Sequence, residues 1–372
     1  MKHSRVAIVG AGINGVMAGW ALIERGYEVS LFEALRPMHA TSRASSKMLH
    51  GGLRYLEQGA FGLIREALLE RHWWLSQQTG LAAPLQIYIP CYKNTGRSPW
   101  VIRAGTLLYD LLAIGSKMPL SRRHEPSQVM QAIPGLRSEG LVGAISYWDA
   151  SMDDEALGLW ALARLQERGL KLHKACRVER LFNDGRMETE QGLETFDHLV
   201  NAAGPWSHHL LTRSELESPY DLLALRGSHL VVDRPLKAGC LFQQHDGRVV
   251  FYLPYKGCAL LGTTEVAASS EDPSEPIKPS QREIDELIEL HNRFVSPRIE
   301  PREIIQTMAG LRPLVLERSQ AAKNTRTISR ESVLLTHGKI VSLLGGKWTT
   351  ARKQGEQIAL AIEASQGFPT TS

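Results

Sequence analysis

The chain has 372 residues, of which 43% are hydrophobic and 22% charged, so it is expected to fold as a globular two-domain protein rather than remain disordered. Its net charge of +4 suits a small anionic ligand or a membrane surface, but it is too weak for a nucleic-acid partner with clustered Lys and Arg. The four cysteines form no C-x-x-C pair, which argues against a metal site or a disulfide framework and favours a cytoplasmic location.

Residues 5–33 predict a strand, a helix and a second strand. The first turn carries Gly10, Gly12 and Gly15 in the G-x-G-x-x-G spacing, and Glu33 ends the second strand. Such glycines allow a tight turn, a close approach of backbone to a pyrophosphate, and packing of helix on strand. The pattern therefore predicts a dinucleotide site in which Glu33 accepts hydrogen bonds from a ribose. The alternatives are a glycine-rich helix that packs on a neighbour and a solvated acid at a strand end.

The same fingerprint serves NAD and FAD, and a second signal favours FAD. Residues 196–210, FDHLVNAAGPWSHHL, predict a strand that ends in small residues, which let the backbone approach a cofactor. The candidate cofactor-binding residues here are Ala203, Gly204 and Trp206. The preceding run KACRVERLF predicts another strand, whose Val178 is expected to lie at the adenine. The alternative is that both runs are ordinary hydrophobic strands.

The middle of the chain is richer in β-strands. Runs at 225–233, 247–255 and 258–265 predict strands of antiparallel character, and the last two suggest a hairpin. The expected fold is α/β, with a Rossmann-like FAD-binding domain and a substrate domain built on an antiparallel sheet. The FAD-binding domain is assigned to residues 1–80, 150–215 and 325–372. The substrate-binding domain is assigned to residues 81–149 and 216–324.

Residues 337–364 predict a strand, a turn at Gly345 and Gly346, and a helix. The free N–H groups at that helix N-terminus would suit the pyrimidine end of a flavin, where negative charge grows on reduction. The alternative is an ordinary turn between a strand and a helix.

Four motifs occur together: GAGINGVMAG, TSRASSKMLHGGLRYLE, MAGLRPL and LLGGKWTTARK. Together they closely resemble the FAD-dependent glycerol-3-phosphate dehydrogenases, within the D-amino-acid-oxidase-like superfamily of flavoenzymes. The resemblance implies that sn-glycerol 3-phosphate is oxidised to dihydroxyacetone phosphate by hydride transfer to flavin N5, with electrons passed to quinone, oxygen or another acceptor. The alternative substrate is a related anion: another phosphorylated alcohol, a 2-hydroxy acid or an amino acid.

The resemblance also assigns the substrate-binding and proton-transfer residues. It places five side chains around the substrate phosphate: Arg54, Tyr55, Arg312, Arg330 and Lys347. Arginine suits this role because its planar fork matches phosphate oxygens, although each cation could instead form a surface ion pair. The candidates for moving the proton are His50 and His229, since histidine titrates near neutral pH, and either could be structural.

The remaining cofactor contacts follow from the same resemblance. Hydroxyls and one amine are expected along the flavin's pyrophosphate and ribityl chain: Thr41, Ser42, Ser45, Ser46 and Lys47. Gly51 and Gly52 are expected to let the backbone lie close to the flavin ring. The final motif is expected to add Gly345, Gly346, Trp348 and Thr349.

The chain departs from the family pattern in two places. Where relatives commonly read Asp-Asp-Ala-Arg-Leu, residues 153–157 read Asp-Asp-Glu-Ala-Leu and lose an arginine. The additional C-terminal helical domain of larger relatives is also expected to be missing. Residues 98–124 mix apolar side chains with Arg103 and Lys117, so they predict either a core-facing helix with a basic flank or an interfacial helix. The second reading would place the enzyme peripherally on the cytoplasmic membrane face.

Overall fold

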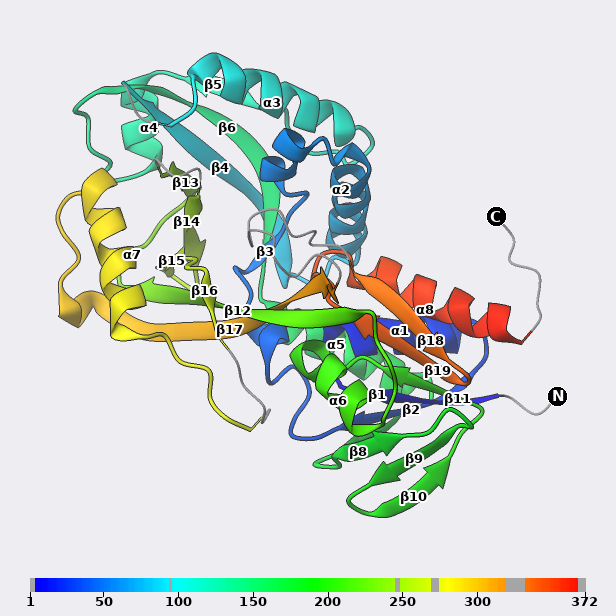
Figure 1. Cartoon of the computed structure of the whole chain (residues 1–372). Helices are drawn as coiled ribbons and strands as arrows, with labels where there is room; N and C mark the ends of the chain where they lie inside the picture. Colours follow the sequence, from blue (N-terminus) through cyan, green and yellow to red (C-terminus); the bar gives the residue numbers. More distant parts are fainter. Residues whose placement is uncertain (1–3, 94–95, 245–247, 269–273, 319–331, 367–372) are drawn as a thin grey trace.

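Two large β-sheets organise the computed structural model, which describes residues 4–93, 96–244, 248–268, 274–318 and 332–366 (Figure 1). Within these ranges one sheet has six strands, the second has ten, and a small third sheet has three. Four short 3-10 helices also occur in the described residues: η1 (Thr41–Arg43), η2 (Leu53–Gln58), η3 (Gly204–Trp206) and η4 (Pro301–Glu303).

The six-stranded sheet has the order β18-β19-β11-β1-β2-β7. Its strands are β1 (Arg5–Val9), β2 (Glu28–Glu33), β7 (Lys171–Lys174), β11 (His198–Asn201), β18 (Val333–His337) and β19 (Ile340–Leu344). All neighbours are parallel except β18 and β19. Strand β1 is buried on both faces, as its unbroken apolar run requires: Val6 and Ile8 join one core, and Ala7 and Val9 join another.

Helices cover both faces of this sheet. The first core packs α1 (Ile13–Glu24), α5 (Asp154–Glu167) and α8 (Ala351–Ser365) against it. Helices α1 and α8 lie so close that a Cβ added to Gly355 would lie 2.2 Å from the carbonyl oxygen of Met17. The other face is covered by α6 (Ser207–Arg213) and by the antiparallel sheet of β8 (Val178–Leu181), β9 (Arg186–Thr189) and β10 (Gly192–Thr195) (Figure 1).

The ten-stranded sheet follows the path β16-β12-β15-β14-β13-β4-β6-β3, with β17 paired to β12 and β5 paired to β6. Its strands are β3 (Met48–Leu49), β4 (Ala82–Tyr92), β5 (Arg122–His124), β6 (Leu141–Met152), β12 (Tyr220–Val232), β13 (Gly239–Gln243), β14 (Val249–Tyr255), β15 (Cys258–Gly262), β16 (Val266–Ala267) and β17 (Ile304–Glu317). All its pairs are antiparallel except β13 with β4, which come from separate stretches of chain and share no hairpin.

This second sheet also separates two cores. Helices α4 (Pro126–Ala132) and α7 (Gln281–Phe294) cover one face, and α2 (Phe61–Ser76) and α3 (Pro99–Leu112) cover the other. Along β12 the side chains alternate as a strand requires: Leu230 and Val232 face the α7 side, and Val231 faces the α2 side.

The expected fold class is confirmed, and so is the hairpin. The β-rich runs appear as β12, β14 and β15, and β14 pairs antiparallel with β15. Lys256 and Gly257 turn the chain between these two strands with φ values of 48° and 80°, the left-handed conformations that a tight hairpin turn uses. A Rossmann-like sheet therefore lies beside a largely antiparallel one, as the sequence predicts.

Candidate active site

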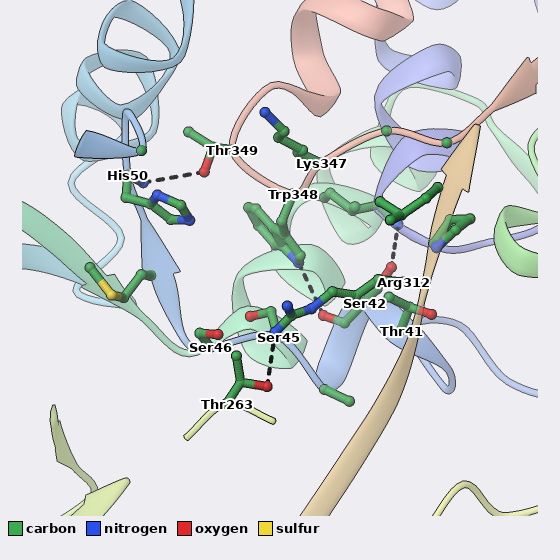
Figure 2. A pocket seen from close by; sticks show the side chains of 18 of the residues that line it. Thr41, Ser42, Ser45, Ser46, His50, Thr263, Arg312, Lys347, Trp348 and Thr349 are labelled. Atoms are coloured by element: carbon green, nitrogen blue, oxygen red, sulfur yellow. Dashed lines mark hydrogen bonds between the residues drawn. The ribbon is translucent and has the colours of Figure 1, made fainter. Parts of the chain in front are cut away.

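A cavity of about 750 Å³ is lined by residues from both large sheets, which is within the range of small-molecule sites. One group of lining residues surrounds the turn after β1 and the end of β2: Gly10, Gly12, Glu33, Val178, Ala203, Gly204 and Trp206. A second group comes from residues 41–55, from β17 and from the turn before α8 (Figure 2). All the predicted site residues that the structure describes line this cavity except Gly15, Lys47 and His229.

The glycine-rich turn is packed too tightly for any side chain at two positions. A Cβ added to Gly15 would lie 1.9 Å from the carbonyl oxygen of Gly10, and one added to Gly10 would lie 2.6 Å from that of Ala202. Gly10 also has a φ of +99°, which favours glycine. Gly15 therefore lets α1 begin directly against the end of β1, while Gly10 and Gly12 line the cavity at the helix N-terminus.

Glu33 holds this turn from the neighbouring strand. Its carboxylate accepts hydrogen bonds from the backbone N–H groups of Ala11 at 2.8 Å and Leu35 at 2.9 Å. Burial raises the pKa of Glu33, and these two hydrogen bonds oppose that rise. Because a carboxylate can accept about four hydrogen bonds, acceptor capacity remains for a ligand hydroxyl.

Two buried polar atoms of the cavity lining have no hydrogen-bond partner among the described residues: Oδ1 of Asn14 and Nδ1 of His39. Asn14 is the second residue of α1, and His39 follows β2. Buried polar groups are rarely left unsatisfied in proteins, so these atoms, the glycine turn and the helix N-terminus fit a polar dinucleotide. The sequence reasoning missed both residues, although Asn14 stands within the glycine motif.

Most of residues 41–46 line the cavity, and several of their hydroxyl groups form hydrogen bonds with other parts of the protein. Thr41 donates to the carbonyl oxygen of Leu311 at 2.6 Å, and Ser42 Oγ accepts from the Ile13 N–H at 2.9 Å. The indole of Trp348 donates to the Ser42 carbonyl oxygen at 3.0 Å (Figure 2). These bonds bring the glycine-rich turn, the turn before α8 and strand β17 together around Thr41 and Ser42.

Lys47 lies outside the cavity lining, contrary to its expected place along the flavin's pyrophosphate and ribityl chain. It is buried, and its Nζ is 2.6 Å from Oδ1 of Asp154 at the start of α5. The second oxygen of Asp154 accepts from both the backbone and the hydroxyl of Ser45. A buried ammonium group must have a partner of opposite charge. Lys47 therefore holds residues 41–46 in place through Asp154, from outside the cavity.

Neighbouring protein atoms leave no room for a side chain at Gly51 or Gly52. A Cβ on Gly51 would lie 2.7 Å from the hydroxyl of Tyr109, and one on Gly52 would lie 2.3 Å from the ring of Tyr55. The Gly51 N–H donates to the Tyr109 hydroxyl at 2.8 Å, and that hydroxyl donates to Asp149 at 2.8 Å. Arg71, with no exposed surface, donates to the same oxygen of Asp149 at 2.7 Å. A buried network thus sets the backbone beside His50.

Predicted phosphate ligands that are far apart in the sequence come together at the cavity. Arg54, Arg312 and Lys347 all line it, with the Lys347 ammonium 4.2 Å from the centre of the Tyr55 ring. Arg312 donates from Nη2 to the hydroxyl of Thr263 at 2.9 Å, as Figure 2 shows. Arg330 lies outside the described residues.

The two candidate histidines occupy different places. His50 lines the cavity, and its backbone N–H donates to the Thr349 hydroxyl at 3.3 Å (Figure 2). His229, on β12, is 1% exposed, and its Nε2 lies 3.1 Å from the hydroxyl of Ser46. Burial, with the nearby charges of Arg312 and Lys47, lowers the pKa of His229 to about 3, so this imidazole is neutral at physiological pH.

Comparison with known proteins identifies the family. The FAD dependent oxidoreductase family model matches residues 5–352. Glycerol-3-phosphate dehydrogenase of Pseudomonas tolaasii is 33% identical, with 94% of this chain and 70% of that protein covered. Aerobic glycerol-3-phosphate dehydrogenase of Escherichia coli is 31% identical, with 96% and 72% covered.

A solved structure shares the fold. It is a glycerol-3-phosphate dehydrogenase from Bacillus halodurans complexed with FAD, with a TM-score of 0.77 at 23% identity. All of this chain is covered, but it spans only 66% of that longer chain, just under two thirds. The resemblance seen in the sequence, and the preference for FAD over NAD, are both confirmed. This chain belongs to the FAD-dependent oxidoreductases and, among them, to the glycerol-3-phosphate dehydrogenase family.

Proposed function

We propose that this enzyme oxidises sn-glycerol 3-phosphate to dihydroxyacetone phosphate and passes the electrons to a quinone. The observation that carries the proposal is the convergence of Arg54, Arg312 and Lys347 with His50 in one cavity. These three cations would bind a substrate that carries a dianionic phosphate, and His50 would accept the one proton that the substrate must lose. Family membership supports the same substrate, because the matched relatives are named glycerol-3-phosphate dehydrogenases.

The protein would hold the cofactor through residues already in place. FAD, when bound, supplies the two-electron acceptance that oxidation of an alcohol requires. Gly10, Gly12 and the N-terminus of α1 would hold its pyrophosphate, and Glu33 would accept from its ribose. The unsatisfied Oδ1 of Asn14, which is an acceptor, would take a hydrogen bond from a hydroxyl group of the cofactor.

His50 is the better candidate for taking the proton of the substrate hydroxyl. It lines the cavity, and its backbone is held by the Thr349 hydroxyl. His229 lies behind Ser46 and does not reach the cavity, and its lowered pKa makes it a poor proton acceptor at neutral pH. We therefore assign proton transfer to His50 and a supporting role to His229, which orients the Ser46 hydroxyl.

A route to a lipid-soluble acceptor is suggested by α3. Large apolar side chains are exposed on this helix and the segment after it, a set that we call the α3 patch: Trp100, Leu107, Leu111, Ile114 and Leu120. Lys117, Arg122 and Arg123 are exposed nearby, and Ile102 on the same helix lines the cavity. No described helix combines the length and the apolar character needed to cross a bilayer. The patch instead suits interfacial attachment to the cytoplasmic membrane face, where quinone is dissolved.

The substrate assignment is tested by flavin reduction. Anaerobic addition of sn-glycerol 3-phosphate to the FAD-loaded protein should bleach the visible flavin absorption, because the two electrons removed from the substrate remain on the cofactor. Glycerol, which lacks the phosphate, should bleach it far more slowly. Bleaching by a 2-hydroxy acid or an amino acid, with none by sn-glycerol 3-phosphate, would refute the proposal.

Replacing His50 should affect the chemical step. We expect His50→Asn to lower kcat by roughly 10²-fold or more, the usual contribution of a general base, with FAD content unchanged. His229→Gln serves as the control and should lower kcat by less than about tenfold, since its side chain lies outside the cavity. Steady-state kinetics on both variants decides between the residues, and the reverse ranking would assign the proton to His229.

Acid should destabilise the protein through His229. Its folded pKa of about 3 lies below its ordinary value of 6.5, so between these pH values the unfolded chain binds a proton that the folded chain does not. From pH 7 to pH 5 this one residue should cost about 2 kcal/mol of unfolding free energy. Urea unfolding of His229→Gln at both pH values should show a loss smaller by about that amount, with His291 contributing equally to both proteins. Equal losses of unfolding free energy in the two proteins would contradict the lowered pKa of His229.

The α3 patch should bind membranes. Wild-type protein is expected to co-sediment with vesicles that contain anionic phospholipid, and Trp100→Ser combined with Leu111→Ser should abolish binding because it removes apolar area from the interface. Leu193→Ser, the same kind of substitution at a 57% exposed leucine on β10, should bind like wild type. Unchanged binding of the double variant would eliminate this surface.

A further inference from the structure

The side chain of Arg312 follows an unusual course from its strand. Arg312 lies on β17 opposite Leu225 of β12, whereas its hydrogen-bond partner Thr263 follows β15 on the other side of β12. The guanidinium must therefore cross β12 to reach Thr263. It crosses at Gly227, where an added Cβ would lie 2.9 Å from Nη2 of Arg312 and 2.7 Å from the hydroxyl oxygen of Thr263. The crossing is possible because Gly227 has no side chain.

The hydroxyl of Thr263 is itself oriented. It donates its one proton to the carbonyl oxygen of Thr264 at 3.1 Å and so presents a lone pair to Arg312. A guanidinium is planar and has donors only, so a fixed acceptor at one edge restricts how the group can turn. Thr263 therefore helps to orient the N–H groups of Arg312.

The residue after Thr263 is held by the buried carboxylate of Glu283. The Thr264 hydroxyl donates to Oε1 of Glu283 at 2.7 Å, and the Ser228 hydroxyl donates to the same atom at 2.8 Å. Arg226 and Ser280 donate to Oε2 of Glu283, which is 1% exposed. Burial alone would raise the pKa of Glu283, but hydrogen bonds from the Ser280 backbone and Arg226 outweigh it and lower this pKa to about 2. Glu283 is therefore a permanent, fully hydrogen-bonded anchor at the first turn of α7.

We propose that Thr263 is a positioning residue for Arg312, held in place by Thr264 and Glu283, and that Gly227 provides the space in which the guanidinium lies. This proposal deepens the proposed function, on which it rests for the identity of the phosphorylated substrate. Its physical basis is preorganisation: an arginine that is already oriented loses less conformational freedom when it binds an anion.

The direct test removes the acceptor without changing shape. In FAD-loaded Thr263→Val, the Kd for inorganic phosphate from calorimetric titration and the KM for sn-glycerol 3-phosphate should each rise about tenfold, the scale of one hydrogen bond to a charged group. We expect kcat to change by less than about threefold, because the phosphate contact persists from bound substrate to transition state. Thr263→Ser, which restores the hydroxyl, should recover both constants. Thr307→Val, at an exposed threonine on the same strand as Arg312, should behave as wild type.

A double-mutant cycle shows whether Thr263 acts through Arg312. In the Arg312→Ala background, Thr263→Val should weaken phosphate binding no further, because the group that it orients is absent. An equal additional loss in that background, wild-type phosphate binding by Thr263→Val, or failure of Thr263→Ser to recover would each overturn the proposal.

Gly227→Ala provides an independent test, since the added methyl group displaces the guanidinium while every hydrogen-bonding group remains. With FAD content and melting temperature confirmed, it should also weaken phosphate binding about tenfold, and wild-type affinity would count against the crossing. Phosphate titration does not depend on turnover. If sn-glycerol 3-phosphate fails to reduce the flavin but phosphate binding still depends on Thr263 and Arg312, the substrate assignment fails while the positioning role stands.

Discussion

The buried ion pair between Lys47 and Asp154 is the constraint on which the arrangement of the site depends. It joins residues 41–52, which include β3 of the ten-stranded sheet, to the first turn of α5. A buried pair of this kind contributes little net stability compared with apolar packing, but loss of either partner would leave an uncompensated charge. Separating Lys47 from Asp154 would therefore be costly, which ties the segment to the start of α5. Ser45 shares the Asp154 carboxylate, so the side of the segment that faces the cavity is set by the same contact.

Besides this ion pair, residues 41–52 form hydrogen bonds with several other parts of the site. Thr41 bonds to β17, Ser42 joins the start of α1 to Trp348, and β3 adds a short edge strand to β6. The Gly51 N–H donates a hydrogen bond to Tyr109, which belongs to a buried network with Asp149 and Arg71. The glycine-rich turn, strand β17 and the proposed catalytic residue His50 are thus held by one continuous piece of backbone, which reduces the ordering that ligands must impose.

The positively charged side chains are supported by the protein in different ways. Lys347 lies over the ring of Tyr55, which attracts a cation without removing its charge. Arg312 is directed by a neutral hydroxyl, and the nearest anchor, the Glu283 carboxylate, is already saturated by other donors. Neither the aromatic ring nor the hydroxyl removes the charge of the side chain that it supports, which suits the anionic substrate proposed above.

Local pattern determined the fold class, the dinucleotide turn and the β14–β15 hairpin, because strand alternation, glycine spacing and turn residues act over a few neighbouring positions. Motif resemblance added the family and most of the predicted site residues that line the cavity. The sequence could not show that Lys47 is a buried anchor, that His229 lies behind Ser46, or that Thr263 directs Arg312 across Gly227. Those facts depend on contacts between segments far apart in the chain, and only tertiary packing decides which polar groups are buried and which partners they must find.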